Sequence, residues 1–150
     1  MKFLFKTADS WTGLVLRLGL GLVMFPHGAQ KVLGWYGGYG FAATMGMFTG
    51  MMHVPAVFAL LAILAESAGS IGLITGCLTR VAAFGILCNM MVAIFMVHLP
   101  NGFFMNWTGK QAGEGFEYHI LAIVIAIVLI LVGGGKWSVD RAITSRIRGE

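Results

Sequence analysis

Three ionisable side chains interrupt the first long apolar stretch of the chain. Arg17, His27 and Lys31 stand within residues 14–33, which otherwise consist mainly of leucine, valine and glycine. A cation near the centre of a bilayer costs on the order of 3 kcal/mol, so such groups inside a membrane segment usually have a partner or a function. His27 and Lys31 are one helical turn apart, so together they could bind a carbonyl group or an anion and exchange protons.

An acidic partner is available in the second apolar stretch, where Glu66 lies in the middle of residues 55–76. At about 1.5 Å per residue, Arg17 and Glu66 are predicted at depths that differ by about 6 Å, which an arginine side chain can bridge. The sequence therefore predicts an intramembrane ion pair between them. The alternative is that Arg17, about two turns from Trp11, extends its side chain to the lipid headgroups. Such a pair can serve helix packing or a proton or substrate site, and both interpretations stay open.

Two candidate proton-exchange groups, Glu117 and His119, open the last apolar stretch. They are separated by about 200° around a helix, so only one can face the interior fully, and we expect this to be Glu117. The predicted ligand pocket then contains His27, Lys31 and Glu117, with aromatic loops beside it. Two donors and one carboxylate suit a quinone headgroup or a small oxyanion.

Metal chemistry is a weaker interpretation of the same end of the molecule. Four methionines between residues 45 and 52, followed by His53, have the composition of a Cu(I) site, but methionine also packs well at interfaces. Haem would require two facing histidines, and of the four histidines His27 is the one predicted well inside a span. We therefore predict no metal site and prefer a quinone to haem or copper. Cys77 and Cys88 form no CxxC motif and are expected to pack.

The composition indicates that these apolar stretches cross a membrane. Hydrophobic residues make up 58% of the 150 residues and charged residues 11%. Such a chain is too apolar for a soluble domain and, at about 20 residues per span, too short for more than about four spans. The excess basic charge lies mostly near the chain ends, where it is typical of membrane topology, and we find no nucleic-acid motif.

We predict an all-α membrane protein, a four-transmembrane-helix bundle that forms a single domain over residues 1–150. The spans and the short basic tail after them are predicted at about 11–33, 55–76, 81–99, 117–133 and 136–150. Two segments rich in glycine and aromatic residues, 34–54 and 101–116, are predicted to lie at the membrane interface. In the third span Asn89 should point inward and bond a neighbouring helix, whereas His98 falls about 180° away.

The distribution of lysine and arginine predicts the orientation. Seven of these residues lie on the side of the two termini and two, Lys31 and Lys110, on the other side. Because cytoplasmic segments carry the excess of positive charge, we predict that both termini are cytoplasmic. The pocket of His27, Lys31 and Glu117 would then lie near the outer face.

Five short motifs occur in order along the chain: LRLGLGLVMFPHGAQKVLG from Leu16, AESAG from Ala65, GCLTR from Gly76, FEYH from Phe116 and GGGKWSVD from Gly133. Their order and spacing resemble the DoxX family of small four-helix bacterial membrane proteins over nearly the whole chain. The resemblance implies a multi-pass protein of a bacterial plasma (inner) membrane. It also implies a membrane component of redox chemistry, since relatives are associated with quinone-linked thiosulfate oxidation, with catechol or quinone handling and with thiol stress.

The resemblance also carries a set of family positions onto this sequence. These are Arg17, His27, Gly28, Lys31, Glu66, Thr79, Arg80, Glu117, Ser138 and Asp140. We therefore expect a membrane redox-associated protein that binds a quinone or a small oxyanion in the outer polar pocket. Its partners would be the lipid bilayer and either a redox protein, as in an oxidoreductase complex, or a second copy of the chain. The alternative is a noncatalytic scaffold subunit whose intramembrane polar groups serve helix packing.

Overall fold

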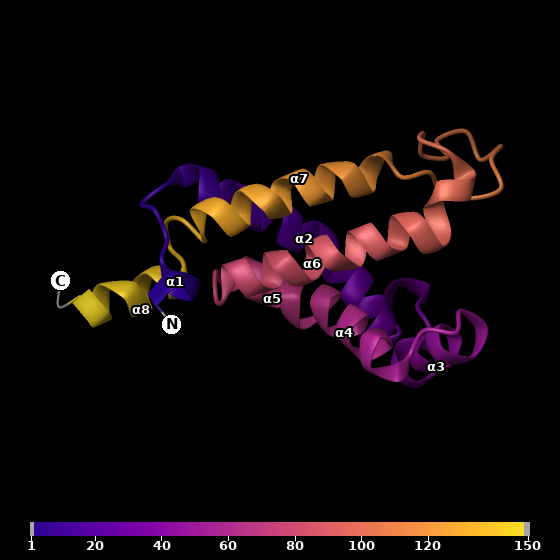
Figure 1. The fold of residues 1–150 in the computed structure, drawn as a ribbon, viewed down its shortest axis with the longest axis horizontal. Coiled ribbons are helices and arrows are strands. Elements are labelled where there is room, and N and C mark those ends of the chain that lie inside the picture. The colour runs from indigo at the N-terminus through magenta and orange to yellow at the C-terminus, as the bar shows by residue number, and fades with distance from the viewer. Residues whose placement is uncertain (1, 149–150) are drawn as a thin grey trace.

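The structure, a computed structural model, describes residues 2–148, and these residues form helices without strands (Figure 1). Three helical segments are long and apolar enough to cross a membrane, namely Trp11–Leu33, Ala56–Thr75 and Thr79–Asn101. A shorter apolar helix follows at Glu117–Val132. The prediction of an all-helical protein with membrane-spanning segments is confirmed at this level.

The first long helix, α2, runs from Trp11 to Leu33 and has a defined cap at each end. The Ser10 hydroxyl accepts a hydrogen bond from the Thr12 N–H at 3.0 Å, and Gly34 ends the helix in the left-handed conformation. Pro26 lies inside α2 without ending it. Arg17 and several small residues lie on the packed face of α2, whose buried residues are Gly13, Leu14, Arg17, Leu20, Gly21, Met24, Gly28 and Ala29.

The second segment consists of two helices, α4 (Ala56–Glu66) and α5 (Ala68–Thr75), because the chain bends at Ser67. At this bend the backbone of Glu66 approaches α2 closely, and a Cβ atom added at Gly28 would lie 2.5 Å from the Glu66 carbonyl oxygen. Glycine at position 28 is therefore needed for the contact. The sequence predicts one continuous helix in this segment, whereas the bend sets Glu66 against α2.

The third segment begins as α6 (Thr79–Ala93) and continues as a π-helical turn, η3 (Ile94–His98), and a 3₁₀ turn, η4 (Leu99–Asn101). A π-helical turn holds more residues than an α-helical turn, so side chains after it point in a different direction than a regular helix predicts. The 180° separation expected between Asn89 and His98 is therefore wrong.

The helices pack around one apolar core. In Figure 1, α6 lies beside α7 (Glu117–Val132) and beside the α4–α5 segment, while α2 contacts α4, α5 and α7. The core contains Leu20, Met24, Leu73, Ala83, Ile86, Met90, Ala122, Ala126 and Leu129. Both chain ends lie at one end of the bundle, which we call the termini end, with the short helices α1 (Lys2–Phe5) and α8 (Val139–Arg148).

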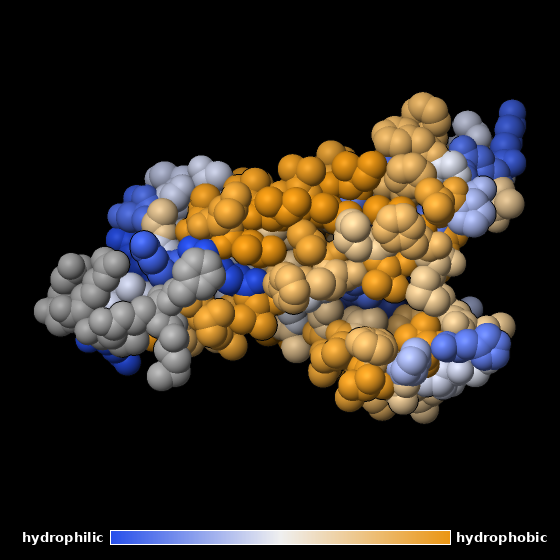
Figure 2. Space-filling model, in the orientation of Figure 1, coloured by the Kyte–Doolittle hydropathy of each residue, from blue (hydrophilic) through white to orange (hydrophobic). Residues whose placement is uncertain are grey.

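The opposite end, which we call the loop end, carries the two aromatic segments. The first folds as η1 (Trp35–Gly37), α3 (Gly40–Gly46) and η2 (Met47–Met51) and packs against α2 and α4. The second is the irregular loop between η4 and α7. Figure 2 shows hydrophobic residues over the middle of the visible face, hydrophilic residues towards both ends, and a notch between the two lobes of the loop end.

Candidate functional site

A polar cluster centred on Glu66 lies inside the bundle. Lys31 Nζ forms an ion pair with one carboxylate oxygen of Glu66, and Asn89 Nδ2 donates a hydrogen bond to the other at 2.6 Å. The Glu66 side chain is 7% exposed and that of Lys31 is 22% exposed. One cation and one amide, each from a different helix, therefore compensate the buried carboxylate. We call Lys31, Glu66 and Asn89 the Glu66 cluster.

Arg17 does not pair with Glu66, which corrects the ion pair expected from the sequence. Its guanidinium points towards the termini end and donates to backbone carbonyls from the end of α5 and from the loop after α7. The acceptors are Leu73 (3.0 Å), Ile74, Gly134 (2.9 Å), Lys136 (3.2 Å) and Trp137 (3.0 Å). The last carbonyls of a helix lack intrahelical partners, and a guanidinium with five N–H donors can satisfy several at once. Lys31, on the same face of α2, pairs with Glu66 instead.

The structure reverses the expected roles of Glu117 and His119. Glu117 is half-buried and accepts hydrogen bonds from the Met105 N–H and from Trp107 Nε1, both at 3.1 Å, so it holds the loop before α7. His119 is the residue that faces the interior, with 6% of its surface exposed. Its Nδ1 atom and the hydroxyl of Tyr118 are buried without a hydrogen-bond partner among the described residues.

His98, which regular helical spacing predicts on the outside of its helix, lies against His119. The two ring centroids are 4.0 Å apart, and His98 Nδ1 is 2.8 Å from the carbonyl oxygen of Glu114 in the loop. No local sequence signal marks the π-helical turn that directs His98 towards α7. His27, in contrast, is exposed, although it interacts electrostatically with Glu66 and with His119.

A small cavity of about 190 Å³ opens at the loop end beside the Glu66 cluster. Its walls are formed by Gln30, Lys31, Gly37, Gly38, Tyr39, Thr44 and Met47. The turn around Gly38 packs tightly on α2, because a Cβ atom there would lie 2.3 Å from the Gln30 carbonyl oxygen. An apolar cavity of about 150 Å³ can hold a benzene molecule, so this cavity is large enough for one six-membered ring. Of the predicted pocket residues, it includes Lys31 but not His27 or Glu117.

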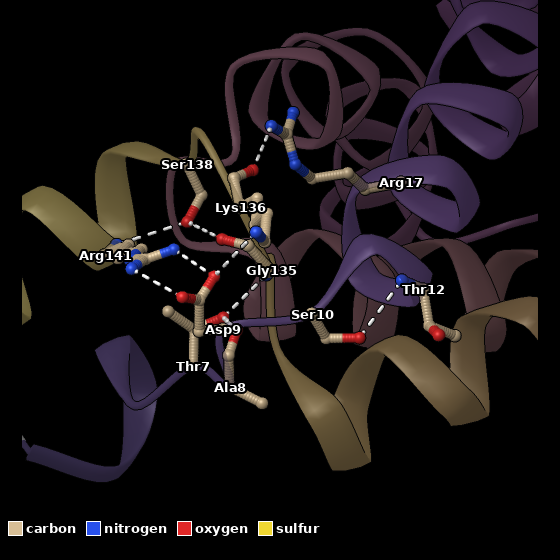
Figure 3. A network of polar contacts seen from close by, with 10 residues as sticks. All are labelled: Thr7, Ala8, Asp9, Ser10, Thr12, Arg17, Gly135, Lys136, Ser138 and Arg141. Carbon is tan, nitrogen blue, oxygen red and sulfur yellow. Dashed lines mark hydrogen bonds and ion pairs between the residues drawn. The ribbon is translucent and has the colours of Figure 1, made fainter.

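A separate polar network closes the termini end. Figure 3 shows the start of the chain, the glycine-rich loop after α7 and the first turn of α8 joined by hydrogen bonds. Thr7 Oγ1 accepts from the Gly135 N–H at 2.6 Å, and the Asp9 carboxylate pairs with Arg141, with one contact at 2.9 Å. The Arg141 guanidinium holds the pKa of the Asp9 carboxyl below its usual value. The network thus fastens α8 to the start of the chain.

Two buried ionic residues connect this network to α6. The Asp140 carboxylate accepts from the backbone N–H groups of Leu78 (2.7 Å) and Thr79 (2.9 Å), which places negative charge at the N-terminus of α6. Arg80 donates to the carbonyls of Lys6, Ile130 and Leu131. The positions that the sequence resemblance singled out divide into two groups. The group at the termini end consists of Arg17, Thr79, Arg80, Ser138 and Asp140. The group in the other half of the bundle consists of His27, Gly28, Lys31, Glu66 and Glu117.

Across residues 2–148, no three side chains of the histidine, cysteine, aspartate or glutamate type come together as a metal site would require.

A family model described as DoxX matches residues 12–99. That range contains the whole Glu66 cluster, the cavity residues and His98, but ends before Glu117 and His119. No curated protein and no solved structure matches the chain.

Proposed function

The chain belongs to the DoxX family, and we propose that it is a membrane redox-associated protein that binds a quinone headgroup in the cavity beside Lys31, as a subunit of an oxidoreductase complex. The observation that carries this proposal is the position of Lys31, which lines the cavity and also pairs with buried Glu66. An ammonium group held in this way can donate a hydrogen bond to a quinone carbonyl. Glu66 can exchange the proton that quinone reduction or quinol oxidation requires.

The charge balance favours a quinone over a small oxyanion. Lys31 is already compensated by Glu66, so an anion in the cavity would meet a paired cation with a buried carboxylate behind it. A neutral ring meets no such repulsion. Tyr39, which is 76% exposed, contributes an aromatic residue at the rim of the cavity, while Lys31 and Thr44 contribute polar side chains. A mostly apolar site with a few polar groups is typical for a small planar ligand.

The packing of the bundle also favours entry of a ligand into the cavity from the loop end. Arg17 and Arg80 fill the termini end with hydrogen bonds between helix ends and loops, whereas the cavity opens at the loop end. We propose four membrane spans with both termini in the cytoplasm of a bacterium, as the lysine and arginine distribution predicts. The common location of both chain ends supports an even number of crossings (Figure 1). A ligand or proton would then reach the site from the outer side.

Cysteine labelling tests this orientation. In a Cys77→Ala, Cys88→Ala background, Gly50→Cys and Thr108→Cys should each react with a membrane-impermeant maleimide in intact cells. Gly50 has open space around it and Thr108 is exposed, so neither change should disturb the fold. Ser145→Cys, in α8, is the matched cytoplasmic position and should react after lysis alone. If Ser145→Cys but neither of the other two reacts in intact cells, the orientation is the opposite of the one proposed.

Ligand titration tests the proposed function itself. The purified protein in mild detergent should bind a short-chain ubiquinone analogue in calorimetry and bind thiosulfate more weakly. Tyr39→Ala should weaken quinone binding about tenfold, since it removes the aromatic residue at the rim without touching the Glu66 cluster. Phe41→Ala is the matched control, because Phe41 is an exposed aromatic residue of the same segment outside the cavity, and it should bind as the wild type does.

Each other outcome of the titration has a definite meaning. Tighter binding of thiosulfate than of the quinone would make the cavity an oxyanion site. Binding of neither, with a correctly folded protein, would contradict the proposal and favour a scaffold subunit whose polar groups serve packing. Equal effects of Tyr39→Ala and Phe41→Ala would place the ligand outside the cavity.

A further inference from the structure

His119 is a buried side chain that the cavity does not use. It is 6% exposed, yet its Nδ1 atom has no hydrogen-bond partner in the described part of the chain, and the neighbouring Tyr118 hydroxyl is in the same state. Nearly all buried polar atoms in proteins are hydrogen-bonded to protein or to ordered water. The unpartnered ring nitrogen of His119 therefore indicates a place for water or for an exchangeable proton.

His98 connects this place to the surface. Its ring lies 4.0 Å from the His119 ring, tilted by 43°, and the residue is half-buried. The Glu114 carbonyl oxygen lies 2.8 Å from His98 Nδ1, which leaves Nε2 available for a second interaction. Two π-helical turns occur in the described residues, η2 and η3, and such turns are often found at functional positions. The second of them, η3, ends at His98, whose ring lies against His119 of α7.

We propose that His119 and His98 form a proton route between the Glu66 cluster and the water at the loop end. The proposal rests on the proposed function, because the route would serve the proton exchanged when a quinone in the cavity is reduced or a quinol oxidised. Protonated His119 gives its proton to neutral His98 through one intervening water. An N–H bond breaks on His119 as another forms on His98, which then releases a proton to water. No electron moves in this step, and uptake follows the reverse path.

The surrounding charges suit such a route. The His119 ring interacts electrostatically with His98 and with His27, and His27 in turn interacts with Glu66 and Lys31. Glu66 also interacts with Tyr118, and the Glu114 carbonyl oxygen lies against His98. Lys31 balances Glu66, so the cluster as a whole carries little net charge. Arg17 and Arg80 occupy the termini end with carbonyl bonds, so the path runs towards the loops.

Exchange of the imidazole N–H protons with water, measured by NMR, tests the route on the ligand-free protein. This exchange requires protons to pass between the ring nitrogens and solvent, so its rate for each histidine shows how readily they do so. In the wild type, His119 should exchange measurably despite its burial. In His98→Gln its rate should fall at least about tenfold, because the amide can keep the bond to the Glu114 carbonyl but cannot carry a proton.

Two further variants separate proton transfer from simple packing. His98→Phe removes both the proton carrier and the bond to Glu114, and His119 should exchange as slowly in it as in His98→Gln. His53→Asn is the matched control, since His53 is an exposed histidine of the other loop in a left-handed conformation that asparagine tolerates, and it should leave the His119 rate unchanged. A wild-type rate in His98→Gln would overturn the proposal, whether or not His98→Phe is slow.

The outcome is separable from the quinone titration. Slow exchange in both His98 variants together with no quinone binding would keep the proton route and reject the ligand. Quinone binding together with unchanged His119 exchange would keep the ligand and reject the route.

Discussion

Arg17→Met should destabilise the protein by on the order of 4 kcal/mol, because several buried carbonyls would lose a charged donor. Arg17 is 2% exposed and its guanidinium joins the end of α5 to the loop that follows α7. Methionine keeps much of the side-chain volume but removes the Arg17 donor from the carbonyl oxygens of Ile74, Gly134 and Trp137. Thermal unfolding in mild detergent measures the loss.

Two further variants serve as comparisons for the stability loss of Arg17→Met. Arg17→Lys keeps the charge but provides a compact ammonium in place of a planar fork, so it should satisfy part of the acceptor set and lie between the wild type and Arg17→Met. Arg146→Met is the control, since Arg146 is an exposed arginine of α8, and it should change stability by less than about 0.5 kcal/mol. If Arg17→Met matched Arg146→Met, the bonds of Arg17 would not hold the termini end together.

The second large effect is expected at the ion pair inside the bundle. Removing one partner of a buried pair costs up to about 3 to 5 kcal/mol, and the partial exposure of Lys31 places Lys31→Met at the lower end of that range. Glu66→Gln keeps an acceptor for Asn89 but leaves the Lys31 ammonium without its counterion. The double variant removes both charges, so it should be less damaging than the sum of the two single variants, with a coupling of about 1 to 3 kcal/mol.

A second cycle with Arg17→Met and Glu66→Gln is the matched comparison. The structure separates these two residues into different polar networks, so their effects should add within about 0.5 kcal/mol. Strong coupling between Arg17→Met and Glu66→Gln, with none between Lys31→Met and Glu66→Gln, would contradict the structure. It would instead support the Arg17–Glu66 ion pair that the sequence predicts.

Sequence reasoning succeeds where one regular helix decides the result. The face of α2 that carries Arg17, Gly28 and Lys31 follows from helical spacing, and the inward position of Asn89 follows in the same way. Both results depend on regular helix geometry within one segment. Within such a segment, helical spacing therefore identifies the face that packs against other helices before any tertiary contact is known.

The predictions from the sequence are wrong where a helix is irregular or where a side chain binds backbone groups instead of another side chain. The bend at Ser67 and the π-helical turn that ends at His98 have no residue pattern of their own, so depth and direction cannot be predicted beyond them. The sequence matches Arg17 to a carboxylate because it reveals side-chain charges, whereas the actual partners are carbonyls of a helix end and a glycine-rich loop. The expected inward position of Glu117 fails for a similar reason, because its carboxylate accepts from groups of the loop.

The most direct test of quinone binding is mass spectrometry of the small molecules that stay with the protein when it is taken from its native membrane into nanodiscs. We expect a quinone in near-stoichiometric amount with the wild type and its loss in Tyr39→Ala, with Phe41→Ala retaining it. A protein that copurifies with a stoichiometric partner subunit but no quinone, in all three forms alike, would contradict the proposed function and identify the chain as a scaffold.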